Sequence, residues 1–204
     1  MTRGELKEWA KGKIKGHIWE LLVPILVAGL LTGLTIGAKA NYTDGKFEYF
    51  AGYNLGFFLY FVEVGLTYFM VQFINDKEYA FSDLFKFAKD YVRIFVVNLL
   101  QCIFVFLWTL LLIVPGIIKG FAYSLVSFLL ADEKYSDLGY MDVLKKSDEM
   151  MKGHKMDLFV FELSYIGWWI LAGFTLGILC IWLVPYYTTA KYKFLNDIKT
   201  GYEK

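Results

Sequence analysis

Long apolar runs alternate with short charged segments along the chain. The runs cover residues 18–38, 50–74, 94–131 and 156–194. A helix rises about 1.5 Å per residue and the hydrocarbon core of a bilayer is about 30 Å thick, so one crossing takes about 20 residues. The first two runs therefore predict one transmembrane helix each, and the last two are long enough for two each. We expect an all-α integral membrane protein with about six transmembrane helices.

Each of the two longest runs contains a natural place to turn. In 94–131 this place is Pro115-Gly116, because proline breaks a helix and glycine accepts turn dihedrals. In 156–194 the flexible, uncharged bend is the segment GFTLG at 173–177. We therefore predict three helical hairpins, with Pro115 and Gly116 at the outer turn of the second. Lys119, just past this turn, is expected to reach the outer headgroups.

The basic residues are distributed unequally between the two predicted sides. Eighteen of the 21 lie before the first span, between spans two and three, between spans four and five, or at and after the end of span six. Lys39 and Lys46 lie on the other side. Cytoplasmic segments are enriched in Lys and Arg, so both termini are expected in the cytoplasm. Ala-Lys-Ala at 38–40 imitates a signal-peptidase site, but the preceding run exceeds the roughly 7–15 apolar residues of a signal peptide.

An amphipathic segment precedes each predicted hairpin, and parts of the chain repeat. KGHIWELLV at 15–23 matches KGHKMDLFV at 152–160, and KDYVRIFVV at 89–97 has the equivalent position before span three. Upstream apolar residues recur at helical spacing in all three segments. We predict one membrane domain over residues 1–204, built from units near 2–74, 82–131 and 137–194. Each unit is an interfacial helix followed by a hairpin.

Short motifs predict where these interfacial helices begin. Thr2 and Glu5 have the spacing of a capping box, in which each side chain binds the other residue's backbone amide. Ser82 and Ser136 are candidate N-caps for the second and third interfacial helices.

Composition agrees with a membrane protein and excludes several functions. Hydrophobic residues make up 57% of the chain, above the roughly 45–50% of soluble domains. The net charge of +1 argues against a nucleic-acid partner. Cys102 and Cys180 lie in apolar runs and form no disulfide framework. The sequence contains no phosphate loop, nucleophile elbow or cofactor motif, so we expect no cofactor and no enzymatic activity.

Polar residues inside the apolar runs are candidates for a site. Glu63 lies near the centre of span two, where a carboxylate costs about 2.5–3.5 kcal/mol on insertion scales. Helical rise places Glu63 and Gln101 at similar depths, roughly 16 and 14 Å, so we expect them to pair. Asn98 and Glu162 form a shallower polar level. We interpret these residues mainly as interhelical hydrogen-bonding groups; a proton- or ion-handling site is the alternative.

The only two histidines are each followed three residues later by an acid. His17 and Glu20 lie at the cytoplasmic end of span one, and His154 and Asp157 at that of span five. If the repeats are related by rotation, the pairs converge into a metal or acid–base site. The alternative is a local pair that orients each helix start. Because neither histidine lies in a metalloprotease-type motif, we expect neither a metal nor catalysis here.

Three segments resemble a known family. PGIIKGFAYSLVSFLLAD (115–132), MKGHKMDLFVFELSYIGWWIL (151–171) and LGILCIWLVPYYTTAKYKFL (176–195) are similar to the bacterial integral membrane family catalogued as domain of unknown function 975. The resemblance extends over about residues 3–196. It implies a bacterial plasma-membrane protein of about six helices without an established activity. A more distant similarity links it to the membrane portion of certain glycerophosphodiester phosphodiesterases, but the catalytic domain of those enzymes is missing.

Three functions remain open from the sequence. The one we favour is a non-catalytic membrane module that binds lipid, a partner protein or a second copy of itself through its interfacial helices. The interspersed acids weaken the lipid version, because they cancel much of the basic charge. The alternatives are a small transporter or channel-like protein that uses Glu63 and Gln101, and a membrane enzyme that uses the two histidine–acid pairs.

Overall fold

The computed structural model of the chain describes residues 2–33, 35–36, 39–43, 46–50, 53–54, 59–111, 113–175 and 177–203. Side chains are described in 2–33, 59–110, 114–175 and 177–203. In chain order the elements are α1 (Arg3–Lys13), α2 (Ile18–Gly33), β1 (Thr35–Ile36), β2 (Lys39–Thr43), β3 (Lys46–Phe50), β4 (Tyr53–Asn54), α3 (Tyr60–Ile74), the 3-10 helix η2 (Phe81–Asp90), α4 (Tyr91–Leu111), α5 (Ile113–Ala122), α6 (Val126–Leu130), the 3-10 helix η3 (Glu133–Tyr135), α7 (Tyr140–Met150), α8 (Lys155–Leu163), α9 (Ile166–Phe174) and α10 (Cys180–Tyr202).

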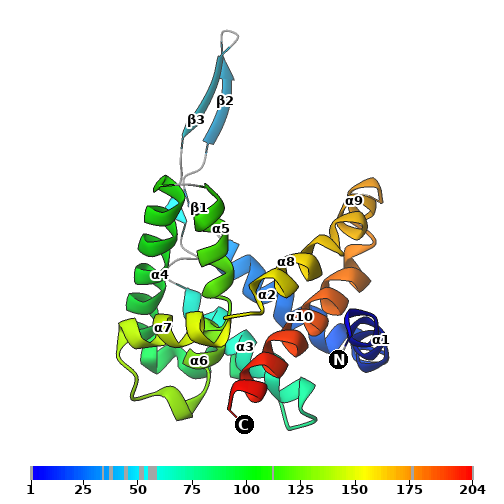
Figure 1. Cartoon of the computed structure of the whole chain (residues 1–204). Helices are drawn as coiled ribbons and strands as arrows, with labels where there is room; N and C mark the ends of the chain where they lie inside the picture. The colour runs from blue at the N-terminus through cyan, green and yellow to red at the C-terminus, as the bar shows by residue number, and fades with distance from the viewer. Residues whose placement is uncertain are drawn as a thin grey trace.

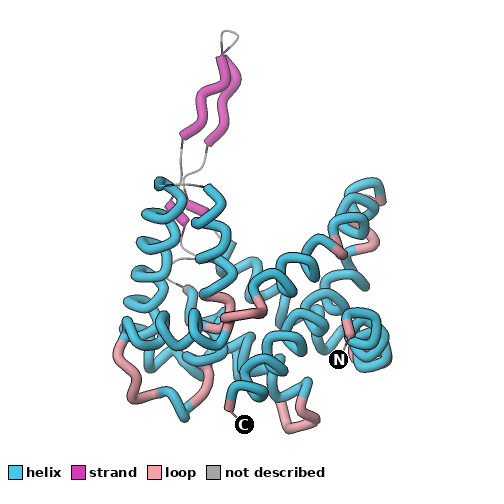
Figure 2. The backbone as a smooth tube through the Cα atoms, viewed as in Figure 1, coloured by secondary structure: helices cyan, strands magenta, loops and turns pink. Residues whose placement is uncertain are grey.

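Helices make up most of the described chain, as the sequence predicts, and two short antiparallel strand pairs add to them. β1 pairs with β4, and β2 pairs with β3 in the register Asn41↔Glu48. Figure 2 shows the β2–β3 ribbon extending away from the helices. The pattern predicted no strands. Residues 50 and 53–54 lie in strands although the prediction placed them in span two.

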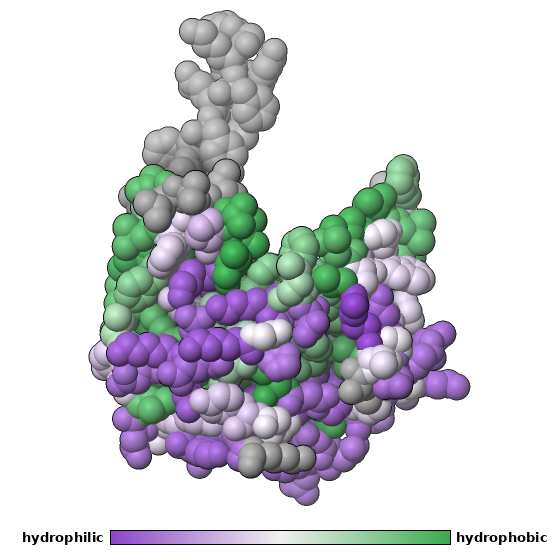
Figure 3. All heavy atoms as spheres, viewed as in Figure 1, coloured by the Kyte–Doolittle hydropathy of each residue, from purple (hydrophilic) through white to green (hydrophobic). Residues whose placement is uncertain are grey.

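The helices form a base from which two arms rise (Figure 1). We use "arms" for α4 with α5, and for α9 with the N-terminal half of α10. We use "base" for α1, α3, α6, α7 and the C-terminal half of α10. Figure 3 shows apolar residues over both arms, and polar residues gathered over the lower part of the molecule, which contains the base. The buried apolar side chains, in contrast to the exposed ones, belong mostly to the base and its neighbours.

Two helical segments are long and apolar enough to cross a membrane, and a third joins them if a bent pair counts as one span. The two are Phe81–Leu110 and Lys155–Phe174, and the bent pair is α1 with α2, which meet at 103°. Helices α3 and Val114–Leu130 are apolar but shorter. Predicted spans 18–38 and 50–74 lie partly outside the described residues, as does position 176 of the predicted GFTLG bend.

The three predicted amphipathic helices are present as α1, η2 and α7, and their apolar faces pack into the protein. In α1, Leu6, Ala10 and Ile14 are buried, and the helix lies against α10. In η2, Leu84 is buried against α3 at Gly65, where an added Cβ would lie only 2.1 Å from the Leu84 carbonyl oxygen. The apolar face of α7 is likewise buried, and the helix contacts α4 and α6.

The predicted helix starts are right for α1 and wrong for the other two. The Glu5 N–H donates to Thr2 Oγ1 (3.3 Å) and the Thr2 N–H donates to Glu5 Oε2 (2.8 Å), so the capping box is formed. Ser82 lies inside η2, whose N-cap is Ala80. The Asp83 carboxylate accepts a hydrogen bond from the N–H of this N-cap residue (2.9 Å). Ser136 follows η3, and Gly139 is the N-cap of α7.

The two KGH segments adopt the same turn, which supports the predicted repeat. Gly16 and Gly153 have φ angles of 91° and 86°, in the left-handed region that glycine adopts without steric cost. In both, the histidine carbonyl then accepts a bond from the amide four residues later, in Leu21 and in Leu158. In both copies the glycine therefore lies in the turn that joins an amphipathic helix to an apolar one.

The outer turn of the second hairpin does not lie at Pro115 and Gly116. Helix α4 ends at Leu111 and α5 begins at Ile113, so both residues lie within α5. Proline is tolerated there because the amides of a first helical turn have no partner in the helix. Gly116 allows close packing of the two helices, since an added Cβ would lie 2.1 Å from Thr109 Oγ1.

The predicted role of Lys119 is also wrong. Its Nζ donates to Asp148 Oδ2 of α7 at 2.7 Å, so it points to the base rather than away from it. The ten residues of α5 measure only about 15 Å. Lys119, in its C-terminal half, contacts the base through Asp148.

Candidate functional site

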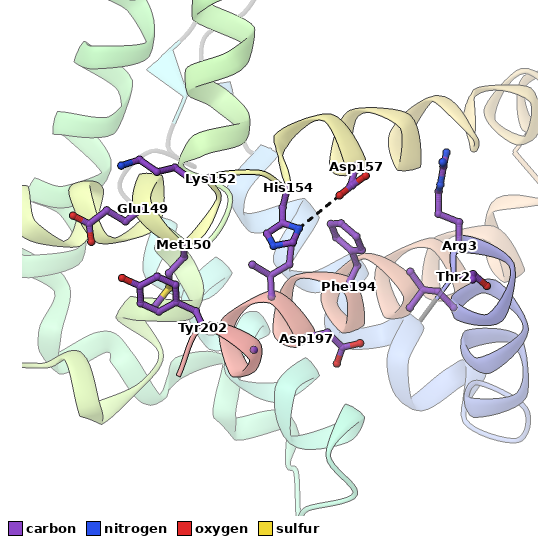
Figure 4. A pocket seen from close by; sticks show the side chains of 13 residues that line it. Thr2, Arg3, Glu149, Met150, Lys152, His154, Asp157, Phe194, Asp197 and Tyr202 are labelled. Carbon is purple, nitrogen blue, oxygen red and sulfur yellow. Dashed lines mark ion pairs between the residues drawn. The ribbon is translucent and has the colours of Figure 1, made fainter. Parts of the chain in front are cut away.

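A cavity of about 860 Å³ lies where α1, α7, α8 and α10 meet. Figure 4 shows His154 and Asp157 of α8 opposite Asp197 of α10, with Thr2 and Arg3 of α1 at one end. We call this the polar-face pocket. Its lining residues are Thr2, Arg3, Leu6, Glu149, Met150, Lys152, His154, Asp157, Phe194, Asp197, Ile198, Gly201 and Tyr202.

The KGH turn places one wall of this pocket. Because the chain turns at Gly153 between α7 and α8, His154 becomes the N-cap residue of α8. His154 Nδ1 lies 3.6 Å from Asp157 Oδ2, and both side chains are about half exposed. A single exposed pair of this kind orients the helix start and contributes little to stability.

Charges of both signs line the pocket. Arg3 and Lys152 form no ion pair within the described residues. Asp197 is paired with Lys193 at 2.5 Å, on its own helix. Glu149 adds a further carboxylate at the α7 side. The pocket therefore offers unpaired cations beside carboxylates rather than a single block of positive charge.

An ion cluster beside the pocket holds α7 in place. The Asp148 carboxylate accepts from Lys119 of α5 (2.7 Å) and from Lys155 of α8 (2.6 Å), and we call these three residues the lysine clip. Partial burial raises the pKa of Asp148, but the bonds and charges of the two lysines outweigh it, so the pKa lies below its usual value. The clip thereby joins three helices at one carboxylate.

The other histidine pair lies elsewhere. His17 Nδ1 is 2.9 Å from Glu20 Oε2, and the imidazole packs against Phe73. Glu20 also accepts from the Tyr79 hydroxyl at 2.8 Å. His17 does not line the polar-face pocket. Within the described residues no group of three or more His, Cys, Asp or Glu side chains could hold a metal, so the alternative in which both pairs build one metal site finds no geometry there.

The predicted pairing of Glu63 with Gln101 is wrong. Glu63 Oε1 accepts from the Tyr192 hydroxyl of α10 at 3.4 Å, whereas Gln101 Oε1 is buried with no hydrogen-bond partner among the described residues. Asn98 Oδ1 accepts from its helical neighbour Cys102 at 3.9 Å. Equal depth does not imply contact, because the direction of a side chain around the helix axis decides which helix it faces.

Glu162, the fourth candidate, belongs to a closed group on α8 and α10. Its Oε2 accepts from the Tyr187 hydroxyl (2.5 Å) and its Oε1 pairs with Lys191 Nζ (2.9 Å). Lys191 also donates to the Tyr187 hydroxyl (3.2 Å). Lys191 was not among the predicted site residues. Its signal was the spacing of Tyr187 and Lys191, which places both on one face of a helix.

Sequence reasoning also missed the contribution of α10 to the polar-face pocket. Phe194, Asp197 and Tyr202 lie beyond or at the end of the apolar run, and the helix continues through them to Tyr202. The available signal was that residues 195–202 contain neither proline nor a turn cluster after the run ends.

Comparison with known proteins finds one family that matches part of the chain, and it gives no function. Residues 109–201 match the family described as Protein of unknown function (DUF975), which confirms the resemblance found in the sequence. The matched region runs from the end of α4 into α10 and includes most of the polar-face pocket. No curated protein and no solved structure matches the chain.

Proposed function

For a chain whose residues 109–201 match the DUF975 family model, we propose a non-catalytic membrane module that binds a segment of a partner protein at its polar-face pocket. The observation that carries the proposal is the inward packing of α1 and α7. Because their apolar faces pack inside the protein, Arg3 of α1 and Glu149 of α7 are left to line the pocket, together with Lys152 just beyond α7. Arg3 and Lys152 are its unpaired cations among the described residues.

The proposal places the arms in a plasma membrane and the base on its cytoplasmic side, with three hairpins and six crossings. The exposed apolar surface of the arms supports this, since monomeric soluble proteins rarely expose such large apolar areas. The bend of 103° between α1 and α2 also supports it, because α1 then lies nearly parallel to the membrane plane when α2 crosses. The excess of basic residues on the same side agrees with cytoplasmic termini.

A protein segment fits the pocket better than an anionic lipid headgroup does. A headgroup site would favour uniformly positive walls, whereas Glu149, Asp157 and Asp197 face the same space as the cations. Interfacial helices that bind lipid also insert their apolar face into the bilayer, and this face of α1 is buried against α10. Mixed charges around a partly apolar pocket suit a peptide that carries both signs.

Site-specific photocrosslinking tests this function in intact cells. A photoreactive residue at Lys152 should yield a discrete protein adduct, and one at Lys145, on the preceding helix α7 but outside the pocket, should not. Arg3→Glu in the Lys152 background should abolish the adduct, and Glu5→Gln in the same helix should not. Adducts with lipid alone would contradict the proposal. An adduct of twice the chain's mass of 23.7 kDa would identify a second copy of this chain as the partner.

Cysteine labelling tests the orientation separately. In a background that lacks Cys102 and Cys180, single cysteines at Asn41 and at Lys152 should react with an impermeant reagent from opposite sides of the membrane. Labelling of both from the same side would contradict the six-span arrangement, and it would leave the crosslinking result unaffected.

A further inference from the structure

A second cavity lies inside the bundle, between α2, α3, α6 and α10, and its volume is about 340 Å³. We call it the inner cavity. Part of its wall is apolar: Ile25, Leu66, Phe128 and Leu195. The rest is polar or glycine: Gly29, Glu63, Ser124, Ser127, Tyr187, Thr188, Lys191 and Tyr192. It shares no residue with the polar-face pocket, and the inference below does not rest on the proposed partner.

Glu63 is the group in this cavity that lacks a strong partner. Its one hydrogen bond among the described residues, from Tyr192, measures 3.4 Å, and ordinary O–H···O bonds measure about 2.5–3.0 Å. The Tyr192 hydroxyl also lies 3.5 Å from Thr67 Oγ1, so Glu63 is not its only neighbouring polar group. A carboxylate in such a place is costly unless a cation or a proton compensates it.

Lys191 acts on Glu63 only through longer-range attraction and makes its direct contacts elsewhere. Its ammonium is paired with Glu162 at 2.9 Å and bonded to Tyr187 at 3.2 Å. Tyr187 in turn donates to Glu162 at 2.5 Å, which closes the group. When both carboxylates are ionised, Glu63 and Glu162 carry one negative charge more than Lys191 balances. A cationic ligand or a proton must then compensate this charge at the inner cavity.

The shape and chemistry of the walls indicate what balances this charge. A volume of about 340 Å³ is at the small end of the roughly 300–1,000 Å³ typical of ligand pockets and far exceeds the size of a bare metal ion. The aromatic residues Phe128, Tyr187 and Tyr192 line the cavity, and the faces of aromatic rings attract cations. Ile25, Leu66 and Leu195 require an apolar part on the ligand, because hydrated inorganic ions gain nothing from them.

We propose that the inner cavity binds a small organic ammonium ion, with its charged end on the Glu63 carboxylate and its apolar part against Ile25 and Leu66. Either a free amine or the ammonium headgroup of a lipid supplies this chemistry. The proposal gives Glu63 a ligand-binding role instead of the structural role expected from the sequence.

Titration calorimetry in nanodiscs of phosphatidylglycerol alone, which contain no lipid ammonium, tests the binding. Butylammonium should bind saturably, methylammonium more weakly and butanol not at all. Glu63→Gln should weaken butylammonium binding at least tenfold, and Glu8→Gln, an exposed carboxylate of α1, should leave it unchanged. Absence of saturable binding to the wild type, equal binding by Glu63→Gln, or equally tight binding of Na⁺ or K⁺ would overturn the proposal.

A second variant keeps the carboxylate and removes the space. A Cβ added at Gly29 meets no atom within 4 Å, and Gly29 lines the cavity, so we expect the side chain of Gly29→Leu to enter it. It should also weaken butylammonium binding, with an unchanged gel-filtration profile as the folding check. Infrared spectra provide an independent readout. A protonated-carboxyl band that Glu63→Gln removes and that butylammonium does not change would show that a proton balances the charge, and would overturn the proposal.

Adding phosphatidylethanolamine to the nanodiscs distinguishes the two sources of the ammonium group. If the headgroup occupies the cavity, the apparent affinity for butylammonium falls in the wild type as the lipid fraction rises. If the affinity stays constant, the site takes free amines.

Discussion

Large apolar side chains in the arms and in the base have opposite environments. Leu110 near the end of α4 exposes 73% of its surface and Phe174 at the end of α9 exposes 81%, whereas Leu144 of α7 exposes 3%. The base has the pattern of a water-soluble protein, with apolar residues inside and charges outside. The arms reverse it. This difference indicates that the base makes its own core, while the arms need an apolar environment that the chain itself does not provide.

Alanine substitutions of two leucines test the comparison most directly. Leu144→Ala should lower the free energy of unfolding by about 2–5 kcal/mol, because it leaves a cavity in the base. Leu110→Ala should change it by less than about 0.5 kcal/mol in detergent, because its neighbours are solvent or detergent rather than protein. Thermal unfolding of both variants in one detergent measures this. Equal losses would show that the arms are packed in a way the structure lacks.

Glycine contacts sharpen the comparison within the backbone. At Gly65 an added Cβ would lie 2.1 to 2.7 Å from backbone atoms of Leu84, which cannot rotate away, whereas at Gly120 of α5 it meets nothing within 4 Å. We expect Gly65→Ala to cost about 1–3 kcal/mol through overpacking. Gly120→Ala should be neutral or stabilise by up to about 1 kcal/mol. Hydrogen exchange in η2 should rise in the first variant only; unchanged exchange would refute the close contact of η2 with α3.

The lysine clip provides a smaller effect at the junction of base and arm. Asp148→Asn keeps the shape but removes the charge that binds Lys119 and Lys155, and should cost about 1–2 kcal/mol, since hydrogen bonds to charged groups contribute about 1.5–3 kcal/mol. Asp142→Asn is the matched control on the same helix. Its pair with Lys145 is exposed at 3.6 Å and is worth about 0–0.5 kcal/mol. Amide exchange in α7 distinguishes the two, and equal exchange in both variants would mean that the clip does not hold α7.

The same base–arm difference explains what could be predicted from the sequence. Helical periodicity depends on local spacing, so the presence of α1, η2 and α7 was predicted, although the starts of η2 and α7 were not. The shared KGH letters predicted a repeat, and the structure shows that both copies form the same turn. Apolar length predicted less well where the long helices begin and end, because residues 50 and 53–54, which were predicted in span two, lie in strands. The Glu63–Tyr192 contact and the role of Gly116 depend on which side of a helix faces which neighbour. Hydropathy carries no such information for runs that are apolar on every side.

The candidate site was predicted in part for the same reason. The KGH turn depends only on neighbouring residues, and it places His154 and Asp157 in the polar-face pocket. Both were predicted as site residues. The wall supplied by α10 comes from a residue span distant in the chain. Only the packing of α1 against α10 brings it there.

The smallest expected effect is a dependence of stability on pH that belongs to the base alone. The bonds and charges of the lysines lower the pKa values of Asp148 and of Asp132, which Lys199 and Lys134 contact, below their usual 3.8 despite the opposing effect of burial. A group with a depressed folded-state pKa stabilises the fold above its unfolded-state pKa. This stabilisation is lost as the pH falls through the folded-state value.

The midpoint of thermal unfolding should therefore be nearly constant from pH 7 to pH 5 and fall below about pH 4. Asp148→Asn should begin lower and fall less steeply, because its contribution is already gone, whereas Asp142→Asn should retain the wild-type slope. Amide exchange in α9, whose residues Ile166–Phe174 contain no ionisable carboxylate, should not follow the pH in this range. A parallel change in α9 and α7 would show that base and arms unfold as one unit, and the distinction between them would then concern burial without separate stability.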